Sequence, residues 1–347
     1  MKLRWLSIII LAALMGCGSK KSTPDVSGIP VKLELQRFDQ DFFSIDTNHI
    51  SQSLPTLQKK YPIFLEDFVQ NILGLSLTDP GSKSDTAIRM FLHDYWIIKD
   101  TASIAFKDST KWMNDIRKGL QFTKHYFPKY QEPQKVITFI GPIDAVYETP
   151  LGKTGDVITQ DALAIGLQLH LGPTASLYQS QAAQTIFPSY VSRRFTPESI
   201  PVNAMKNIVD DIFPDQTPGK SLLDQMVDKG KRLYVLGLLL PDCPDTLKIG
   251  YSKRQLDGCI ANEGLIWNFF LTNDLLYNND NARIQSYIEE GPSTQEFAGG
   301  DIPGFIGLFV GWQIVKKYME KFPDTSPEAL LGMDAKQILT DSKYKPK

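Results

Sequence analysis

The chain has few of the residues on which common catalytic and metal sites are built. It has three cysteines and four histidines in 347 residues, and no two histidines stand at the spacing of a metal-binding pair. It also lacks a Gly-x-Ser-x-Gly motif, a His-Glu-x-x-His motif, and a glycine-rich loop followed by Lys-Ser or Lys-Thr. We therefore predict no catalytic residue, no bound metal and no cofactor.

Excess positive charge and long apolar runs are also missing. The net charge is −2, and no basic block exceeds two or three residues. Nucleic-acid binding and a polybasic membrane patch are therefore not indicated. The apolar run Trp5–Met15 has eleven residues, whereas a membrane-spanning helix needs about 20.

The beginning of the chain has the pattern of a secreted, lipid-modified protein. Lys2 and Arg4 precede the apolar run, and Leu14-Met-Gly-Cys17 follows, which is typical of a signal peptide over residues 1–16. Leu-x-Gly-Cys resembles the bacterial lipobox, in which the cysteine receives the lipid. We expect lipidation at Cys17, a flexible tether over residues 17–30, and one globular domain over residues 31–347.

The residues after Cys17 bear on location. Gly18 is not the aspartate that retains many lipoproteins in the inner membrane, and Ser19-Lys-Lys21 is not an acidic surface-export run. We expect the periplasmic face of the outer membrane.

Hydrophobic periodicity predicts a helix-dominated α+β domain with a small sheet. Helical spacing extends from Ile50 to about Phe127 and resumes after Tyr178. The predicted strands are Val31–Phe38, Val136–Ile140, its hairpin partner Asp144–Glu148, and Ala162–Leu171, with Gly166 at a bulge or close approach.

Four helices are predicted in the second half of the chain. They are Ile200–Phe213, Ser221–Leu239 with an interruption at Gly230, a long helix Ser252–Tyr277, and Gly304–Phe322. Gly304, Gly307 and Gly311 stand at helical spacing, which indicates a bare side where a neighbour packs closely.

Two cysteines remain after Cys17. Cys243 and Cys259 form either a disulfide, which the secreted compartment permits, or two buried free thiols. The sequence leaves both alternatives open.

Several motifs together resemble the GldB family of gliding-motility lipoproteins from Bacteroidota. In chain order they are Phe38-Asp39, Ile165-Gly-Leu-Gln-Leu-His-Leu-Gly172, Asp224-Gln-Met-Val-Asp-Lys-Gly-Lys-Arg-Leu-Tyr234, Leu238-Leu-Leu-Pro241, Lys248-Ile-Gly-Tyr251, Gly311-Trp-Gln-Ile-Val-Lys-Lys-Tyr-Met319 and Lys343-Tyr-Lys-Pro346. The resemblance implies a role in gliding with envelope proteins that also serve type IX secretion. It supplies no catalytic residue, and Gln168 replaces the aspartate usual in the family.

A more distant similarity is to zincin-type metallopeptidases, with the metal site lost. Asn203 and Asn207 share a helix face where two histidines would bind zinc, and Ala204 stands where the general base would be. Asp228, on the next helix, matches a third-ligand position. Amides bind zinc poorly and alanine cannot take a proton, so such a site would be inactive. The alternative is an ordinary amphipathic helix with two asparagines.

Two functional hypotheses follow. The first is a non-enzymatic, membrane-tethered interaction protein, with an exposed apolar surface around the loop Gly291–Pro303. The second is a divergent hydrolase or metallopeptidase that uses His93, His125, His170 or carboxylates brought together by folding. A solute-binding lipoprotein would need two similar lobes around a hinge, and the sequence has no such division.

Overall fold

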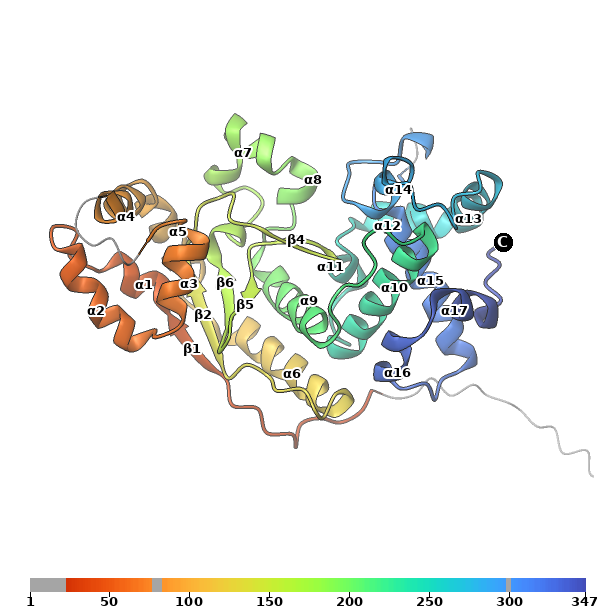
Figure 1. The fold of residues 1–347 in the computed structure, drawn as a ribbon, viewed down its shortest axis with the longest axis horizontal. Helices are drawn as coiled ribbons and strands as arrows, with labels where there is room; N and C mark the ends of the chain where they lie inside the picture. The colour runs from red at the N-terminus through yellow and green to blue at the C-terminus, as the bar shows by residue number, and fades with distance from the viewer. Residues whose placement is uncertain (1–22, 77–82, 298–300) are drawn as a thin grey trace, which may run out of the picture.

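The computed structural model describes residues 23–76, 83–297 and 301–347. Two halves lie side by side in it (Figure 1): the small sheet with the early helices, and the later helices α10 to α17. In chain order, the α-helices of the described residues are α1 (Phe38–Phe43), α2 (Ile50–Lys60), α3 (Phe64–Asp67), α4 (Lys83–Asp94), α5 (Trp96–Ala105), α6 (Thr110–Tyr126), α7 (Gln181–Ile186), α8 (Ser189–Ser192), α9 (Ile200–Ile212), α10 (Leu222–Leu239), α11 (Asp245–Ile249), α12 (Lys253–Ala261), α13 (Glu263–Thr272), α14 (Asn281–Ile288), α15 (Ile306–Lys321), α16 (Pro327–Gly332) and α17 (Ala335–Ser342).

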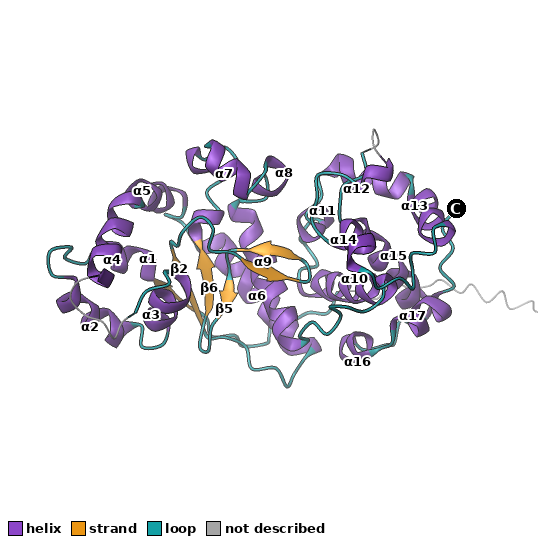
Figure 2. Ribbon diagram, turned by 45° about the horizontal axis from the view of Figure 1, so that its top comes forward, coloured by secondary structure: helices purple, strands orange, loops and turns teal. Residues whose placement is uncertain are grey.

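The strands are few and short, and helices surround them (Figure 2). They are β1 (Glu34–Arg37), β2 (Lys135–Phe139), β3 (Tyr147–Thr149), β4 (Gly152–Thr154), β5 (Val157–Ile158) and β6 (Leu163–Gly166). The main sheet has the order β1-β2-β6-β5, with β5 antiparallel to β6 and the other pairs parallel. The predicted helix-dominated α+β class is confirmed.

The predicted hairpin between Val136–Ile140 and Asp144–Glu148 is wrong. β2 pairs in parallel with β1 on one side and β6 on the other, so both of its edges are already used. β3 instead pairs with β4 in a separate two-stranded ribbon. The predicted close approach at Gly166 is confirmed, because a Cβ there would lie 2.7 Å from the Gly155 carbonyl oxygen.

Two helix predictions also need correction. Gly230 does not interrupt α10, which is continuous from Leu222 to Leu239. The predicted helix Ser252–Tyr277 is two helices, α12 and α13, that meet at Asn262. The side-chain amide of Asn262 donates to the Gly258 carbonyl oxygen at 2.8 Å, a local bond that is typical of asparagine near a helix end.

The bare side of α15 packs directly against α10. A Cβ on Gly311 would lie 1.8 Å from the Met226 carbonyl oxygen, and one on Gly230 would lie 2.2 Å from the Gly311 carbonyl carbon. The backbones of α10 and α15 therefore touch directly. The glycine face that the sequence predicts is present, and α10 supplies the neighbour.

One hydrophobic core extends through both halves, from Val26 to Tyr344. Val26 belongs to the segment expected to be a tether, yet its side chain is buried. The Gln121 amide and the Lys124 ammonium of α6 donate to the carbonyl oxygens of Ile29 and Pro30. The chain is therefore fixed to α6 before β1 begins. Among the described residues, none of the helices combines the length and the apolar character needed to cross a bilayer.

Substitution of Gly311 by alanine tests the contact between α10 and α15. The added methyl group overlaps the Met226 carbonyl oxygen, so the helices must separate. We expect a loss of at least about 1–3 kcal/mol in the free energy of unfolding, the usual cost of overpacking, measured by urea denaturation. Gly332→Ala is the matched control, because nothing lies within 4 Å of a Cβ at that position. Equal stability of the two variants would contradict this account.

Candidate functional site

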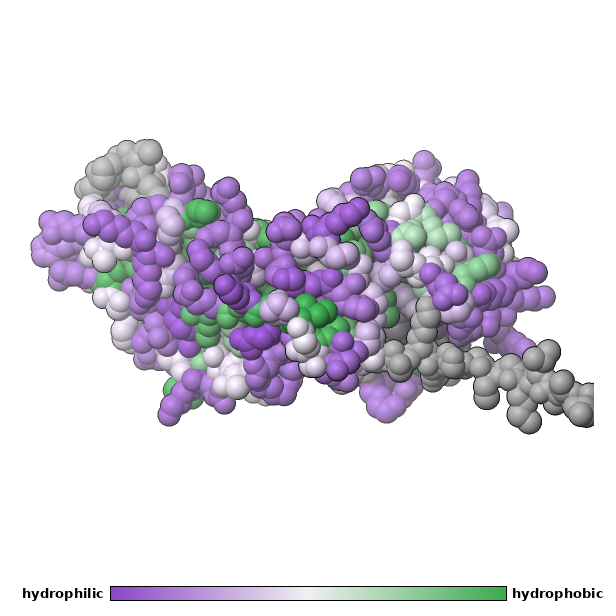
Figure 3. Space-filling model, turned by 90° about the horizontal axis from the view of Figure 1, so that it is seen from below, coloured by the Kyte–Doolittle hydropathy of each residue, from purple (hydrophilic) through white to green (hydrophobic). Residues whose placement is uncertain are grey.

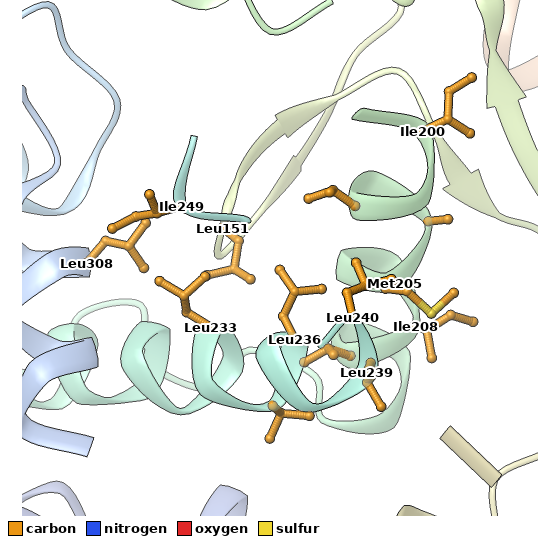
Figure 4. Packing of buried hydrophobic residues seen from close by; sticks show 14 of the residues in the cluster. Leu151, Ile200, Met205, Ile208, Leu233, Leu236, Leu239, Leu240, Ile249 and Leu308 are labelled. Atoms are coloured by element: carbon orange, nitrogen blue, oxygen red, sulfur yellow. The ribbon is translucent and has the colours of Figure 1, made fainter. Parts of the chain in front are cut away.

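The ribbon of β3 and β4 reaches from the sheet half to the helical half (Figure 1). Its tip is Pro150-Leu151, and the Leu151 side chain is buried. Figure 4 shows Leu151 pointing toward Leu233 and Leu236 of α10. The tip therefore joins the two halves through hydrophobic packing.

Two buried lysines hold the backbone of this tip. Lys206 of α9 donates to the Leu151 carbonyl oxygen at 3.1 Å, and Lys229 of α10 donates to the Pro150 carbonyl oxygen at 3.0 Å. The Lys229 ammonium also lies 5.4 Å from the centre of the Phe305 ring. Both lysines are only 8% exposed. The partners of these two buried positive charges are thus uncharged: backbone carbonyls for both lysines, and also the face of the Phe305 ring for Lys229.

A pocket opens beside Lys206, between the start of α9 and the segment that connects α11 to α12. Its cavity volume is about 260 Å³. The lining residues are Arg193, Arg194, Phe195, Thr196, Ser199, Asn203, Lys206, Thr246, Leu247, Gly250, Tyr251, Ser252 and Lys253. Four of these side chains are cationic, and none of these lining residues is acidic.

The cations differ in their partners. Arg194 forms an ion pair with Glu290, with Nη1 to Oε1 at 2.5 Å. Arg193 donates to the Gly250 carbonyl oxygen at 2.8 Å, which carries no formal charge. Lys253 is exposed and pairs with Asp257. Arg193 and Lys206 therefore bring positive charge to the pocket without an ion pair of their own.

Local sequence explains how these side chains are placed. Arg193 and Arg194 directly follow α8, and Ser199 precedes α9 after a turn that begins at Pro197. Ser252 and Gln255 form a capping box that starts α12 at Lys253. Two helix beginnings therefore border the pocket, where backbone N–H groups favour negative charge.

The structure separates the four residues of the zincin hypothesis. Asn203 lines the pocket. Asn207 turns its amide to the carbonyl oxygens of Asp156 and Asn203, at 3.2 and 2.9 Å, and Ala204 is fully buried. Asp228 is bonded to the Arg232 guanidinium at 2.6 Å and lines another pocket, beside α16. Asn203 and Asn207 are therefore neighbours, as predicted, but Asp228 does not line their pocket.

A buried ion pair lies behind Asn207. Asp156 and His170 are almost completely buried, and His170 Nε2 is 2.9 and 3.0 Å from the two carboxylate oxygens. His170 Nδ1 faces the Thr196 carbonyl oxygen at 3.2 Å. Because both ring nitrogens face acceptors, the doubly protonated ring satisfies them best. Asp156 also accepts from the Gly166 N–H of β6 at 3.0 Å, so the pair connects β6 to Thr196 in the wall of the pocket.

The other histidines do not join His170. His93 is exposed on α4 beside Asp94, and His125 is exposed on α6. Within the three described segments, His, Cys, Asp and Glu side chains form no group of three or more that could hold a metal ion. His93 and His125 therefore do not meet His170, which folding brings together with the carboxylate of Asp156.

The cysteines and Gln168 complete the sequence-based candidates. Cys243 and Cys259 are both free, so the structure contains the thiol alternative rather than the disulfide. Burial raises the pKa of both thiols, for Cys259 to about 12. Gln168 is buried, and its Oε1 accepts from the Gly141 N–H. Cys17 lies outside the described residues.

Cations, hydroxyl groups and an amide suit this pocket to anion binding. Asn203 is the sequence-based candidate that lines it. Sequence reasoning missed Arg193, Arg194 and Lys206 as site residues. The available signals were the arginine doublet just before Thr196-Pro197 and the spacing of Asn203 and Lys206, three residues apart on one side of α9.

The pH dependence of stability tests the burial of Lys206. Burial, together with the nearby Arg194, lowers the pKa of Lys206 from its ordinary 10.5 to about 8, against an opposing effect of Glu290. Between these values the unfolded chain binds more protons, so the free energy of unfolding rises with pH. We expect wild type to gain about 1–2 kcal/mol from pH 7 to 9.5 relative to Lys206→Met, measured by urea denaturation. Parallel pH profiles would contradict the burial of a charged Lys206.

Comparison with known proteins identifies the family. No curated protein and no solved structure matches the chain. The family model described as "Gliding motility protein GldB" matches residues 19–346, which is nearly the whole chain. The chain therefore belongs to the GldB family of gliding motility proteins.

Proposed function

We propose that this protein is a lipid-anchored, non-enzymatic interaction component of the gliding machinery in the bacterial envelope. Family membership supports the link to gliding. The lipid is attached at Cys17, on the periplasmic face of the outer membrane, and the partners are other motility and type IX secretion proteins. Mass spectrometry of the mature N-terminus tests the lipid attachment.

The side chains that line the pocket and their neighbours on α9 support binding rather than chemistry. At the position of the zincin general base stands Ala204, which has no group to accept a proton and is fully buried. Asn207 already uses its amide in hydrogen bonds to two backbone carbonyls. Cations and hydroxyls suit the pocket to holding an anion. These positions favour an interaction protein over a hydrolase.

The observation that carries an interaction role is the unusual surface of α5. Its sequence, Trp-Ile-Ile-Lys-Asp-Thr-Ala-Ser-Ile-Ala, is apolar on most sides, which is typical of a buried helix. Yet Ile97 is 73% exposed and Ile104 is 80% exposed. They stand seven residues apart and share one face, with Trp96 and Met90 also exposed. We call Met90, Trp96, Ile97 and Ile104 the α5 surface.

The position of the α5 surface favours a protein partner over the membrane. The N-terminal segment crosses the bottom of the molecule in Figure 1, near α6, whereas α4 and α5 lie at the upper left. Figure 3 shows the molecule from below, and this face is predominantly hydrophilic. Exposed Asp94 and Asp100 also lie beside the α5 surface. An envelope protein of the gliding apparatus is therefore the proposed occupant.

Paired asparagine substitutions test this surface. We expect Ile97→Asn with Ile104→Asn to abolish gliding and co-purification of envelope partners, because both side chains would lose apolar contacts with the partner. Unfolding should be little changed, since surface substitutions usually shift stability by less than about 0.5 kcal/mol. The readouts are colony spreading and quantitative affinity purification.

The control is Ile260→Asn with Leu265→Asn, on α12 and α13. These side chains are also more than half exposed. Their helices contact Phe297 and Asp301 of the loop Gly291–Pro303, around which the sequence predicts the interaction surface. Wild-type gliding of this control is expected. Wild-type gliding of the α5 variant would disprove the α5 surface as the docking site.

Metal content tests the non-enzymatic part of the proposal. Because Asn203 and Asn207 are poor zinc ligands and Asp228 is engaged with Arg232, we expect wild-type protein purified without chelators to hold far less than one metal ion per chain. The measurement is inductively coupled plasma mass spectrometry. One equivalent of zinc that survives dialysis would instead support the metallopeptidase hypothesis.

A further inference from the structure

The pocket beside Lys206 contains more positive charge than its surroundings balance. Arg193 and Lys206 have backbone carbonyls as their hydrogen-bond partners. Arg194 is balanced by Glu290, and Lys253 by Asp257. With these two ion pairs counted, Arg193 and Lys206 have no ion pair of their own, and the single carboxylate of Glu290 attracts both while it is paired with Arg194.

The charge of Arg194 repels both of these groups. The pKa values of Lys206 and Arg193 are both lowered, first by burial and then by the charge of Arg194. Holding like charges together in a partly buried site is unfavourable without a counterion. A bound anion would remove this repulsion and gain charge-assisted hydrogen bonds.

The walls indicate what kind of anion fits. Thr196 and Asn203 supply a hydroxyl and an amide, whereas the Ser199 hydroxyl donates to the Arg194 carbonyl oxygen. Phe195 and Leu247 supply apolar surface. A cavity volume of about 260 Å³ is larger than a single oxyanion needs. The ligand therefore has a charged end and a further, less polar part.

We propose that this pocket binds a phosphomonoester, with the phosphate between Arg193 and Lys206 and the remainder against Phe195 and Leu247. The phosphate of such an ester carries about −1.5 to −2 charges at neutral pH, which matches the two cations without an ion pair of their own. A carboxylate has half of that charge. The proposal goes beyond the interaction role and does not depend on the α5 surface.

The phosphomonoester can belong to a free solute or to a lipid headgroup. The pocket is bordered by α8, α9, α11 and α12. In Figure 1, α8 and α12 lie in the upper part of the molecule and α11 near its middle, all above the N-terminal segment. That position favours a solute over the membrane in which the protein is anchored. The experiment therefore includes one arm for each source.

Isothermal titration calorimetry with phenyl phosphate tests the proposal, using the mature chain in nonionic detergent at pH 7.5 and constant ionic strength. We expect saturable binding that is at least tenfold weaker in Arg193→Gln and in Lys206→Met. Lys107→Gln removes an exposed positive charge elsewhere and should bind as wild type does. Benzoate, a carboxylate of similar shape, should bind at least tenfold more weakly than phenyl phosphate.

Whether the phosphomonoester belongs to a solute or to a lipid headgroup is decided by co-sedimentation of the protein with phosphatidic acid vesicles, compared with phosphatidylcholine vesicles. Binding to phenyl phosphate alone assigns a solute, and additional Arg193-dependent binding to phosphatidic acid assigns a lipid headgroup. No binding of either probe overturns the proposal, as does binding that Arg193→Gln leaves unchanged or benzoate affinity equal to that of phenyl phosphate. Arg193→Gln changes a half-buried side chain, so it keeps the test valid if Lys206→Met does not fold. Loss of this binding would leave the α5 result unaffected.

Discussion

The direct backbone contact between α10 and α15 is the constraint on which the rest of the structure depends. Gly230 and Gly311 bring the two helices closer than any side chain would allow. In this position, Lys229 of α10 donates to the β3–β4 tip, and Arg232 of α10 binds Asp210 of α9. The site therefore rests on a helix whose place is fixed by two residues without side chains. A change at either glycine would be transmitted to every element that α10 contacts.

The β3–β4 tip links the packing of α10 to the cationic pocket through Lys206. Leu151 is inserted among apolar side chains of α10, while the carbonyl oxygens of Pro150 and Leu151 receive the two buried lysines. Burying a lysine is costly, and these lysines form direct hydrogen bonds that tie the sheet half to the helical half. Lys206 serves both the tip and the pocket. The charge that attracts an anion is thus part of the same contact that joins the two halves.

Periodicity predicted the elements well where the pattern was local. The boundaries of α9, α10 and β2 were predicted to within one or two residues. The bare side of α15 follows from the spacing of Gly307 and Gly311, whereas Gly304 precedes the helix and approaches Gly291 instead. The errors concern partners distant in sequence. Nothing near Asp144 shows that β2 already has two parallel neighbours, and nothing in α10 shows that Gly230 faces another glycine.

In the candidate site, too, local relations were predicted correctly and contacts between separate elements were not. Asn203 and Asn207 were placed together correctly because they share one helix. The absence of Asp228 from their pocket, and the meeting of Arg193 with Lys206, depend on how α8, α9 and α10 assemble. Sequence spacing does not contain that information, because these contacts join segments that tertiary packing alone brings together.

The fixed segment at Val26 has a consequence for how the protein stands in the envelope. Eight residues separate Cys17 from Val26, so even a fully extended chain spans at most about 30 Å between them. With a lipid at Cys17, the domain is held close to the bilayer with α6 on the near side. A connecting segment this short limits the rotation of the domain relative to the bilayer. The α5 surface and the cationic pocket then face away from the membrane. In the proposed arrangement, a motility partner would reach these two surfaces from the side of the domain opposite the N-terminal segment.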